Sequence, residues 1–65
     1  MIITVNGQSR EIAAGTSVSS LLSEMKLSPD RVAVELNRRL LKSDRYGQAL
    51  KDGDEVEIVT FVGGG

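Results

Sequence analysis

The amino-acid sequence predicts an α+β fold, in which a mixed sheet of four to five strands is covered on one face by one main helix. Several segments alternate apolar and polar residues with the period of two that is typical of half-buried strands. One segment near residue 20 has instead the 3.6-residue period of an amphipathic helix. Because the strand segments alternate and do not form continuous apolar runs, the sheet is expected to bury one face and leave the other open.

Residues 1–13 predict a β-hairpin. Its turn is Asn6-Gly7, a dipeptide that suits the positive φ angles of a two-residue type I′ turn. A two-residue loop aligns three pairs across the hairpin, namely Val5 with Gln8, Ile3 with Arg10 and Met1 with Ile12. Arg10 therefore shares the apolar face, where its stem is expected to cover the core edge while its guanidinium reaches water.

The helix is expected to run from Ser17 to Lys26. The spacing i, i+3, i+4, i+7 places four apolar residues on one side, Val18, Leu21, Leu22 and Met25. Ser17 is placed as the N-cap, and Lys26 lies favourably near the negative end of the helix dipole. Pro29 is expected to end the helix, because the residue before a proline is biased away from helical geometry.

The second half of the chain predicts the remaining strands. Residues 32–36 alternate strictly, and the turn Asn37-Arg38 leads to a short apolar pair, residues 40–41. Residues 43–47 have too few apolar positions for more than a single capped turn. A tight turn, residues 52–54, precedes a last strand from Glu55 to Phe61. The inward apolar set is predicted to be Met1, Ile3, Val5, Ile12, Val18, Leu21, Leu22, Met25, Leu27, Val32, Val34, Leu36, Leu40, Leu50, Val56 and Ile58.

The composition argues against several classes of function. The 65 residues include no cysteine and no histidine, which removes disulfides, the usual zinc and haem ligands, and Cys–His or Ser–His–Asp nucleophiles. A net charge of −1 argues against a nucleic-acid backbone as the main partner. No apolar run reaches the ~20 residues of a membrane span, and no signal-peptide pattern is visible. We therefore expect a cytoplasmic protein with no membrane partner.

The chain ends in Gly63-Gly64-Gly65, directly after the last predicted strand. Together with Val-Ala-Val-Glu-Leu-Asn at 32–37, Asp-Gly-Asp at 52–54 and Glu-Val-Glu-Ile-Val at 55–59, this ending resembles the sulfur carrier proteins of thiamin biosynthesis, a family of the ubiquitin-like β-grasp group. The resemblance covers essentially all 65 residues. It implies a β-grasp domain over residues 1–62 and a flexible glycine tail over residues 63–65.

The resemblance also implies a carrier that is not itself an enzyme and binds no cofactor. In that family a ubiquitin-activating-like adenylyltransferase uses ATP to adenylate the terminal glycine, here Gly65, and a sulfur donor such as a cysteine desulfurase converts it to a thiocarboxylate. Thiazole synthase then receives the sulfur. Gly64 and Gly63 would thread the tail into the partner enzymes, and the free carrier is expected to be a monomer. The family commonly has Asn-Gly where this chain has Asn37-Arg38, so Arg38 would either cost about 1 kcal/mol in a left-handed conformation or adopt another turn type.

An apolar patch is expected beside the tail. Val59 and Phe61 point away from the inward residues of their strand, and with Ala33 and Val62 they could dock the activating enzyme and the synthase. The alternatives are that Phe61 simply covers the sheet edge, or that single exposed apolar residues have no function.

Charged residues are distributed unevenly. Five of the eight basic residues lie between positions 31 and 45, namely Arg31, Arg38, Arg39, Lys42 and Arg45. A solvated surface is the simpler interpretation, because aromatic residues for stacking on RNA are nearly absent, and complementarity to an acidic partner is the alternative. Four acidic residues, at positions 52, 54, 55 and 57, invite comparison with a metal site. However, Asp-Gly-Asp before a strand is more often a turn, and the spacing is not that of an EF-hand loop, so no metal site is predicted.

Two other functions are compatible with the same pattern. One is a different thiocarboxylate carrier, such as the small subunit of molybdopterin synthase. The other is a β-grasp interaction module, in which the glycines are a frayed end and the basic stretch binds RNA or a protein.

Overall fold

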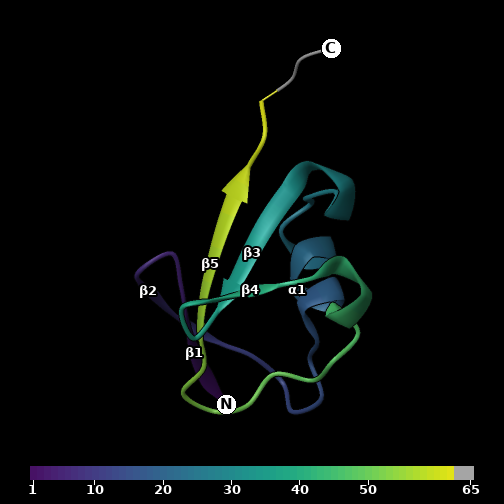
Figure 1. Cartoon of the computed structure of the whole chain (residues 1–65). Coiled ribbons are helices and arrows are strands. Elements are labelled where there is room, and N and C mark those ends of the chain that lie inside the picture. Colours follow the sequence, from purple (N-terminus) through teal and green to yellow (C-terminus); the bar gives the residue numbers. More distant parts are fainter. Residues whose placement is uncertain (63–65) are drawn as a thin grey trace.

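The computed structural model describes residues 1–62 and shows one five-stranded sheet with a helix packed on one face (Figure 1). Along the chain the elements are β1 (Ile2–Val5), β2 (Gln8–Glu11), α1 (Val18–Glu24), the 3-10 turn η1 (Pro29–Arg31), β3 (Val32–Leu36), β4 (Arg39–Leu41), the 3-10 turn η2 (Ser43–Arg45) and β5 (Glu55–Thr60). The strand order is β2-β1-β5-β3-β4. Since β5 runs parallel to β1 and antiparallel to β3, the sheet is mixed and the predicted α+β fold is confirmed.

The predicted hairpin and its register are confirmed. Asn6 and Gly7 have φ angles of 50° and 82°, and the paired residues include Ile3 with Arg10 and Val5 with Gln8. The pairing continues past the strands, because the Ile12 amide donates to the Met1 carbonyl at 2.8 Å. Arg10 is half-buried, and its Nη2 lies 3.6 Å from Glu24 Oε1 on the helix.

The helix begins as predicted but ends earlier. Ser17 is the N-cap and its hydroxyl accepts a hydrogen bond from the Ser20 amide at 3.1 Å. The last helical residue is Glu24, so the prediction that the helix reaches Lys26 is wrong. Lys26 has a φ of 60°; its amide donates to the carbonyl of residue 23, and the Leu27 amide donates to the carbonyl of residue 22.

These two hydrogen bonds form a Schellman motif, which closes a helix with a left-handed residue. The residue after the left-handed position is Leu27, which packs partly buried against the core. The apolar contact of Leu27, rather than Pro29, therefore accounts for where the helix stops. Pro29 instead starts the short turn η1.

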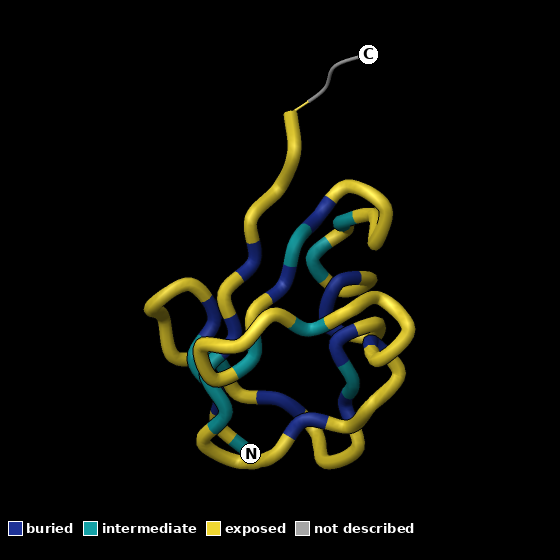
Figure 2. The backbone as a smooth tube through the Cα atoms, in the orientation of Figure 1, coloured by how far each residue is buried: buried dark blue, intermediate teal, exposed yellow. Residues whose placement is uncertain are grey.

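The core lies between the sheet and α1 (Figure 2). Its buried apolar residues are Ile3, Val5, Ile12, Val18, Leu21, Leu22, Val32, Val34, Tyr46, Leu50, Val56 and Ile58. All of these were predicted except Tyr46, which is only 5% exposed directly after η2. Met1, Met25, Leu27 and Leu36 pack against the core partly buried.

The prediction that Leu40 faces inward is wrong, because this residue is 69% exposed. The two-residue turn at Asn37-Arg38 pairs Leu40 with Glu35, and paired residues project from the same face of a sheet. Leu40 therefore lies on the open face with Glu35. Its neighbour Leu41 pairs with Val34 and packs partly against the core instead.

The structure also tests the predicted turn after β4 and the predicted end of the last strand. The single turn predicted within residues 43–47 is confirmed as η2. The last strand ends at Thr60, one residue before the predicted end, although the Phe61 amide still donates to the Arg31 carbonyl at 2.8 Å. Within the described residues, no helix has the length and apolar character needed to cross a membrane.

Candidate functional site

β5 occupies the centre of the sheet (Figure 1). In the sequence, residues 61 and 62 and then the glycines at 63–65 follow it. Gly63, Gly64 and Gly65 lie outside the described residues. The roles expected for them, threading for Gly63 and Gly64 and acyl transfer for Gly65, stay predictions. The structure describes the strand that precedes them in the sequence and the surface beside that strand.

Asn6 holds one side of β5. Its backbone amide donates to the Val56 carbonyl at 2.9 Å. Its side-chain Oδ1 accepts from the Ile58 amide at 2.7 Å, and its Nδ2 donates to the Ile58 carbonyl at 3.2 Å. The side chain thus makes the two hydrogen bonds that a further residue of β1 would make, and it extends the pairing of β5 beyond the end of β1.

Asn37 holds the other side of β5 in a similar way. Its amide donates to the Glu55 carbonyl at 2.7 Å, and its Oδ1 accepts from the Glu55 amide at 2.9 Å. Its Nδ2 donates to Asp54 Oδ1 at 3.0 Å. The sequence indicated these asparagines as turn residues but not as hydrogen-bond partners of β5. The one signal in the sequence was that each asparagine is the first residue of a two-residue turn.

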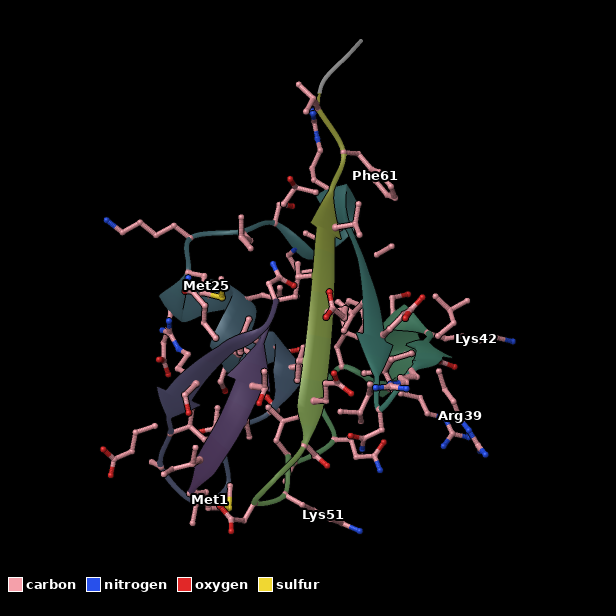
Figure 3. All side chains as sticks on the ribbon, turned by 90° about the vertical axis from the view of Figure 1, so that its left-hand side faces the viewer. Met1, Met25, Arg39, Lys42, Lys51 and Phe61 are labelled. Carbon is pink, nitrogen blue, oxygen red and sulfur yellow. The ribbon has the colours of Figure 1, made fainter. Side chains whose placement is uncertain are left out.

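The predicted apolar patch lies at the end of β5 nearest residues 63–65, and we call Ala33, Val59, Phe61 and Val62 the tail-side patch. Val59 lies opposite Ala33 in the register of β3 and β5. Val59, Phe61 and Val62 are exposed at 58%, 56% and 97%, and Ala33 is half-buried. Figure 3 shows the Phe61 ring projecting beside the upper end of β5. An exposed ring of this kind is available to a partner protein.

A shallow groove of about 480 Å³ continues from this patch over the open face of the sheet. It is lined by Ala33, Glu35, Arg38, Leu40, Glu55, Glu57 and Val59. Glu35 lies directly opposite Glu57, whereas Glu55 Oε1 pairs with Arg38 Nε at 3.4 Å. Within residues 1–62, neither Glu35 nor Glu57 has a cation within 4.0 Å. Like charges directly opposite each other destabilise a sheet, so this pair favours a partner that brings positive charge. Alternation along the sequence does not predict this pair, because the pair depends on the register of β3 and β5.

The acidic residues before β5 have structural roles. Asp52 Oδ1 accepts from the Ile2 amide at 2.8 Å, and Asp54 Oδ2 accepts from the Lys51 amide at 2.8 Å. These bonds fix the turn, as the Asp-Gly-Asp pattern indicated. In the part of the chain that the structure describes, no group of acidic residues is arranged to hold a metal ion.

The five basic residues between 31 and 45 do not form one surface. Arg31 lies beside Phe61, and Arg38 pairs with Glu55 on the open face. The other three, Arg39, Lys42 and Arg45, line a second groove along β4 and η2. The stretch is therefore divided among three places.

Comparisons with known proteins identify the family. The ThiS family model matches residues 3–65. A thiazole synthase of Paramagnetospirillum magneticum is 41% identical over 66 residues, and the match covers all of this chain but 20% of that protein. The chain thus spans about a fifth of the length of the thiazole synthases that it matches. The sulfur carrier protein ThiS of Bacillus subtilis is 40% identical over 50 residues, covering 75% of this chain and 76% of that protein.

Solved structures agree. The crystal structure of a ThiS thiamine biosynthesis protein from Geobacter metallireducens is 39% identical, covers 100% of both chains and has a TM-score of 0.82. A ubiquitin-like protein from Caldiarchaeum subterraneum, 23% identical, has a TM-score of 0.56 over 98% of this chain and 100% of that chain, which shows the ubiquitin-like fold alone. The family model spans nearly the whole sequence and the structure has the expected β-grasp architecture, so the resemblance seen in the sequence is confirmed and the chain belongs to the ThiS family.

Proposed function

We propose that this protein is a cytoplasmic sulfur carrier of thiamin biosynthesis, a protein co-substrate rather than an enzyme, whose terminal carboxyl group at Gly65 carries sulfur as a thiocarboxylate. The observation that carries the proposal is that the ThiS family match extends through Gly65, and Gly65 follows the central strand of the sheet. The β1 and β3 strands and the two asparagines fix β5, so the residues that follow it have a defined starting point.

The chemistry requires activation of the carboxyl group. A carboxylate is an anion at neutral pH and a weak electrophile, so an adenylyltransferase would join it to the AMP portion of ATP and release pyrophosphate. A sulfur nucleophile then attacks the acyl carbon and AMP leaves. A sulfide gives the thiocarboxylate directly, whereas the persulfide of a cysteine desulfurase gives an acyl disulfide that a second thiol reduces. Glycine suits both steps because no Cβ hinders the approach to the acyl carbon.

Docking of the two partner enzymes is assigned to the tail-side patch and the adjoining open face. The patch joins a large exposed aromatic ring at Phe61 to aliphatic surface at Val59, which is the composition of an interface anchor. Partnership with a thiazole synthase is supported by the P. magneticum protein of that name, because part of it matches this whole chain.

Intact mass spectrometry tests the sulfur-carrying role. The protein is incubated with ATP, a ubiquitin-activating-like adenylyltransferase and a sulfur donor, and we expect a gain of about 16 Da, since one oxygen is replaced by sulfur. The gain should require ATP and should map to Gly65.

Two variants are matched to this test. One residue appended after Gly65 moves the carboxylate out of register, and Gly64→Val puts a branched side chain in a narrow channel, so both should abolish loading. Neither variant alters the core, and thermal unfolding should stay nearly unchanged. Full loading of the extended protein, with the added residue shown to be intact, would refute the assignment to Gly65.

A further inference from the structure

The second groove lies along β4 and η2, at the opposite edge of the sheet from β2. It has a volume of about 520 Å³. Its lining includes three cations, Arg39, Lys42 and Arg45, together with the leucines at positions 36, 40 and 41 and Gln48. Figure 3 shows Arg39 and Lys42 reaching outward from this edge, away from the tail-side patch. The lining of the groove thus combines apolar side chains with positive charge.

The positive charge of this groove is not neutralised within the described residues. Arg39, Lys42 and Arg45 are all exposed, and none has a carboxylate within 4.0 Å in residues 1–62. Arg10 and Arg38, in contrast, each pair with a glutamate. Three cations around one groove repel each other, so a negatively charged partner would bind with a favourable electrostatic contribution.

The backbone at this edge is open as well. β4 is the outermost strand, and Leu36 and Arg39 flank the two-residue turn as a hydrogen-bonded pair. Since antiparallel pairing alternates along the strand, the N–H and C=O groups of Leu40 face away from β3. An edge of this kind can pair with an added strand.

We propose that the groove along β4 and η2 binds an acidic, extended segment of a partner protein, which adds a strand to the sheet beside Leu40. The faces of β4 specify the pattern of that segment. Arg39 and Leu41 lie on the helix-covered face and Leu40 lies on the open face. An acidic side chain of the segment would meet Arg39 on the covered face, and an apolar side chain next to it would cover Leu40 on the open face. Further acidic side chains would meet Lys42 and Arg45, which follow β4 in the chain and line the same groove.

Nucleic acid fits the groove less well. The sequence has one Tyr, one Phe and no Trp. Tyr46 is buried, and Phe61 lies at the end of β5, away from Arg39 and Lys42 (Figure 3). No aromatic residue lines the groove, so none is available there to stack on a base. The groove shares Leu40 with the groove on the open face but contains no residue of the tail-side patch, and the inference does not depend on sulfur loading.

NMR titration of the ¹⁵N-labelled full chain tests the proposal. The probe is a capped pentapeptide in which glutamate and valine alternate, and the control is the same peptide with glutamine in place of glutamate. We expect saturable shifts of the amides from Arg39 to Arg45 with the glutamate peptide alone. Its affinity should fall at least about fivefold when salt is raised from about 50 mM to about 500 mM.

Charge variants locate the site. The triple variant Arg39→Gln, Lys42→Gln and Arg45→Gln should lose binding. A control triple, Lys26→Gln, Arg31→Gln and Lys51→Gln, removes the same charge from exposed positions elsewhere and should bind like the parent protein. Strand addition is tested separately with two peptides, each N-methylated at a different set of alternate backbone amides. Only the peptide that lacks the N–H groups facing β4 should lose binding.

The possible results are distinct. Equal binding of the two triple variants would mean non-specific attraction and would overturn the proposal, as would shifts centred outside residues 39–45 or the absence of shifts. Equal binding of both methylated peptides would exclude the added strand. Stronger shifts with a single-stranded oligouridylate would favour nucleic acid and reject an acidic protein segment.

Discussion

Individual residues in this protein adopt backbone conformations that their side chains disfavour. Asn37 and Arg38 have φ angles of 52° and 70°, which is the geometry of a type I′ turn. Of the two possibilities for this turn, the structure shows the first. The turn keeps its type, and Arg38 adopts the left-handed conformation. Its pairing with Glu55 adds little, since the Arg38 side chain is 84% exposed.

Replacing Arg38 by glycine should therefore stabilise the protein. A left-handed conformation costs an ordinary residue about 1–2 kcal/mol, and the greater freedom of glycine in the unfolded chain offsets part of the gain, so we expect roughly 0.5–1 kcal/mol more free energy of unfolding. Urea denaturation measures this change. Arg38→Ala is the control, since it removes the ion pair and keeps the strain, and it should stabilise nothing. A loss of stability in Arg38→Gly would show that the ion pair outweighs the strain.

At the scale of the elements, β5 depends on side-chain hydrogen bonds as well as on neighbouring strands. Asn6→Gly keeps the positive φ of the turn but deletes the two bonds to Ile58. We expect this variant to lose about 1–2 kcal/mol of stability, because the bonds are partly buried. Amide exchange at Ile58 should become faster, since its N–H loses its acceptor.

Asn37→Gly provides the matched control for this prediction. It makes the same change in the other turn, but its side-chain bonds are exposed and involve Asp54 and Glu55. Its cost should be smaller, and exchange at Ile58 should not change. Unchanged Ile58 exchange in Asn6→Gly would contradict the role given to the Asn6 side chain.

The elements also show what the sequence could and could not predict. Hairpin register followed from Asn6-Gly7, because a two-residue turn aligns every pair after it. The end of α1 could not be predicted in this way, because its left-handed residue is Lys26 and not the glycine that usually marks a helix end. The apolar contact of Leu27 depends on the packed core, which the sequence pattern does not show. Tyr46 was missed because it follows a short turn without periodicity, and Leu40 was misplaced because its face depends on strand pairing.

The same limit applies to the candidate site. Alternation along one strand was enough to predict that Val59 and Phe61 face outward. The opposition of Glu35 and Glu57, and the gathering of the three cations at β4, depend on which strands are neighbours, which periodicity does not reveal.

At the scale of the whole molecule, the sheet has one face covered by the helix and one face that is free. The free face holds the tail-side patch at the C-terminal end of β5. It also holds Ile2 on β1, whose carbonyl accepts a hydrogen bond from the Gly53 amide just before β5 begins. Ile2 and Phe61 are almost equally exposed, at 55% and 56%. They therefore form a matched pair for locating the docking surface.

Phe61→Ala should weaken binding to the activating enzyme by about 1–3 kcal/mol, as expected for an interface anchor. Ile2→Ala should have little effect on binding. Both variants should keep nearly the full melting temperature, because both side chains are more than half exposed. Isothermal titration calorimetry and thermal denaturation give the two quantities. A large loss of melting temperature with unchanged affinity would instead assign Phe61 a structural role.

The parallel pairing of β1 with β5 has a consequence for how the chain folds during synthesis. β1 and β2 form one antiparallel unit and β3 and β4 another, and β5 is the strand that joins them. Because β5 comes last among the described strands, the ribosome releases the two hairpins before the strand that connects them. A nascent chain that stops before β5 has no continuous sheet, and such chains are targets for proteolysis. A complete fold therefore reports that synthesis has passed through β5 and reached the segment before the glycines.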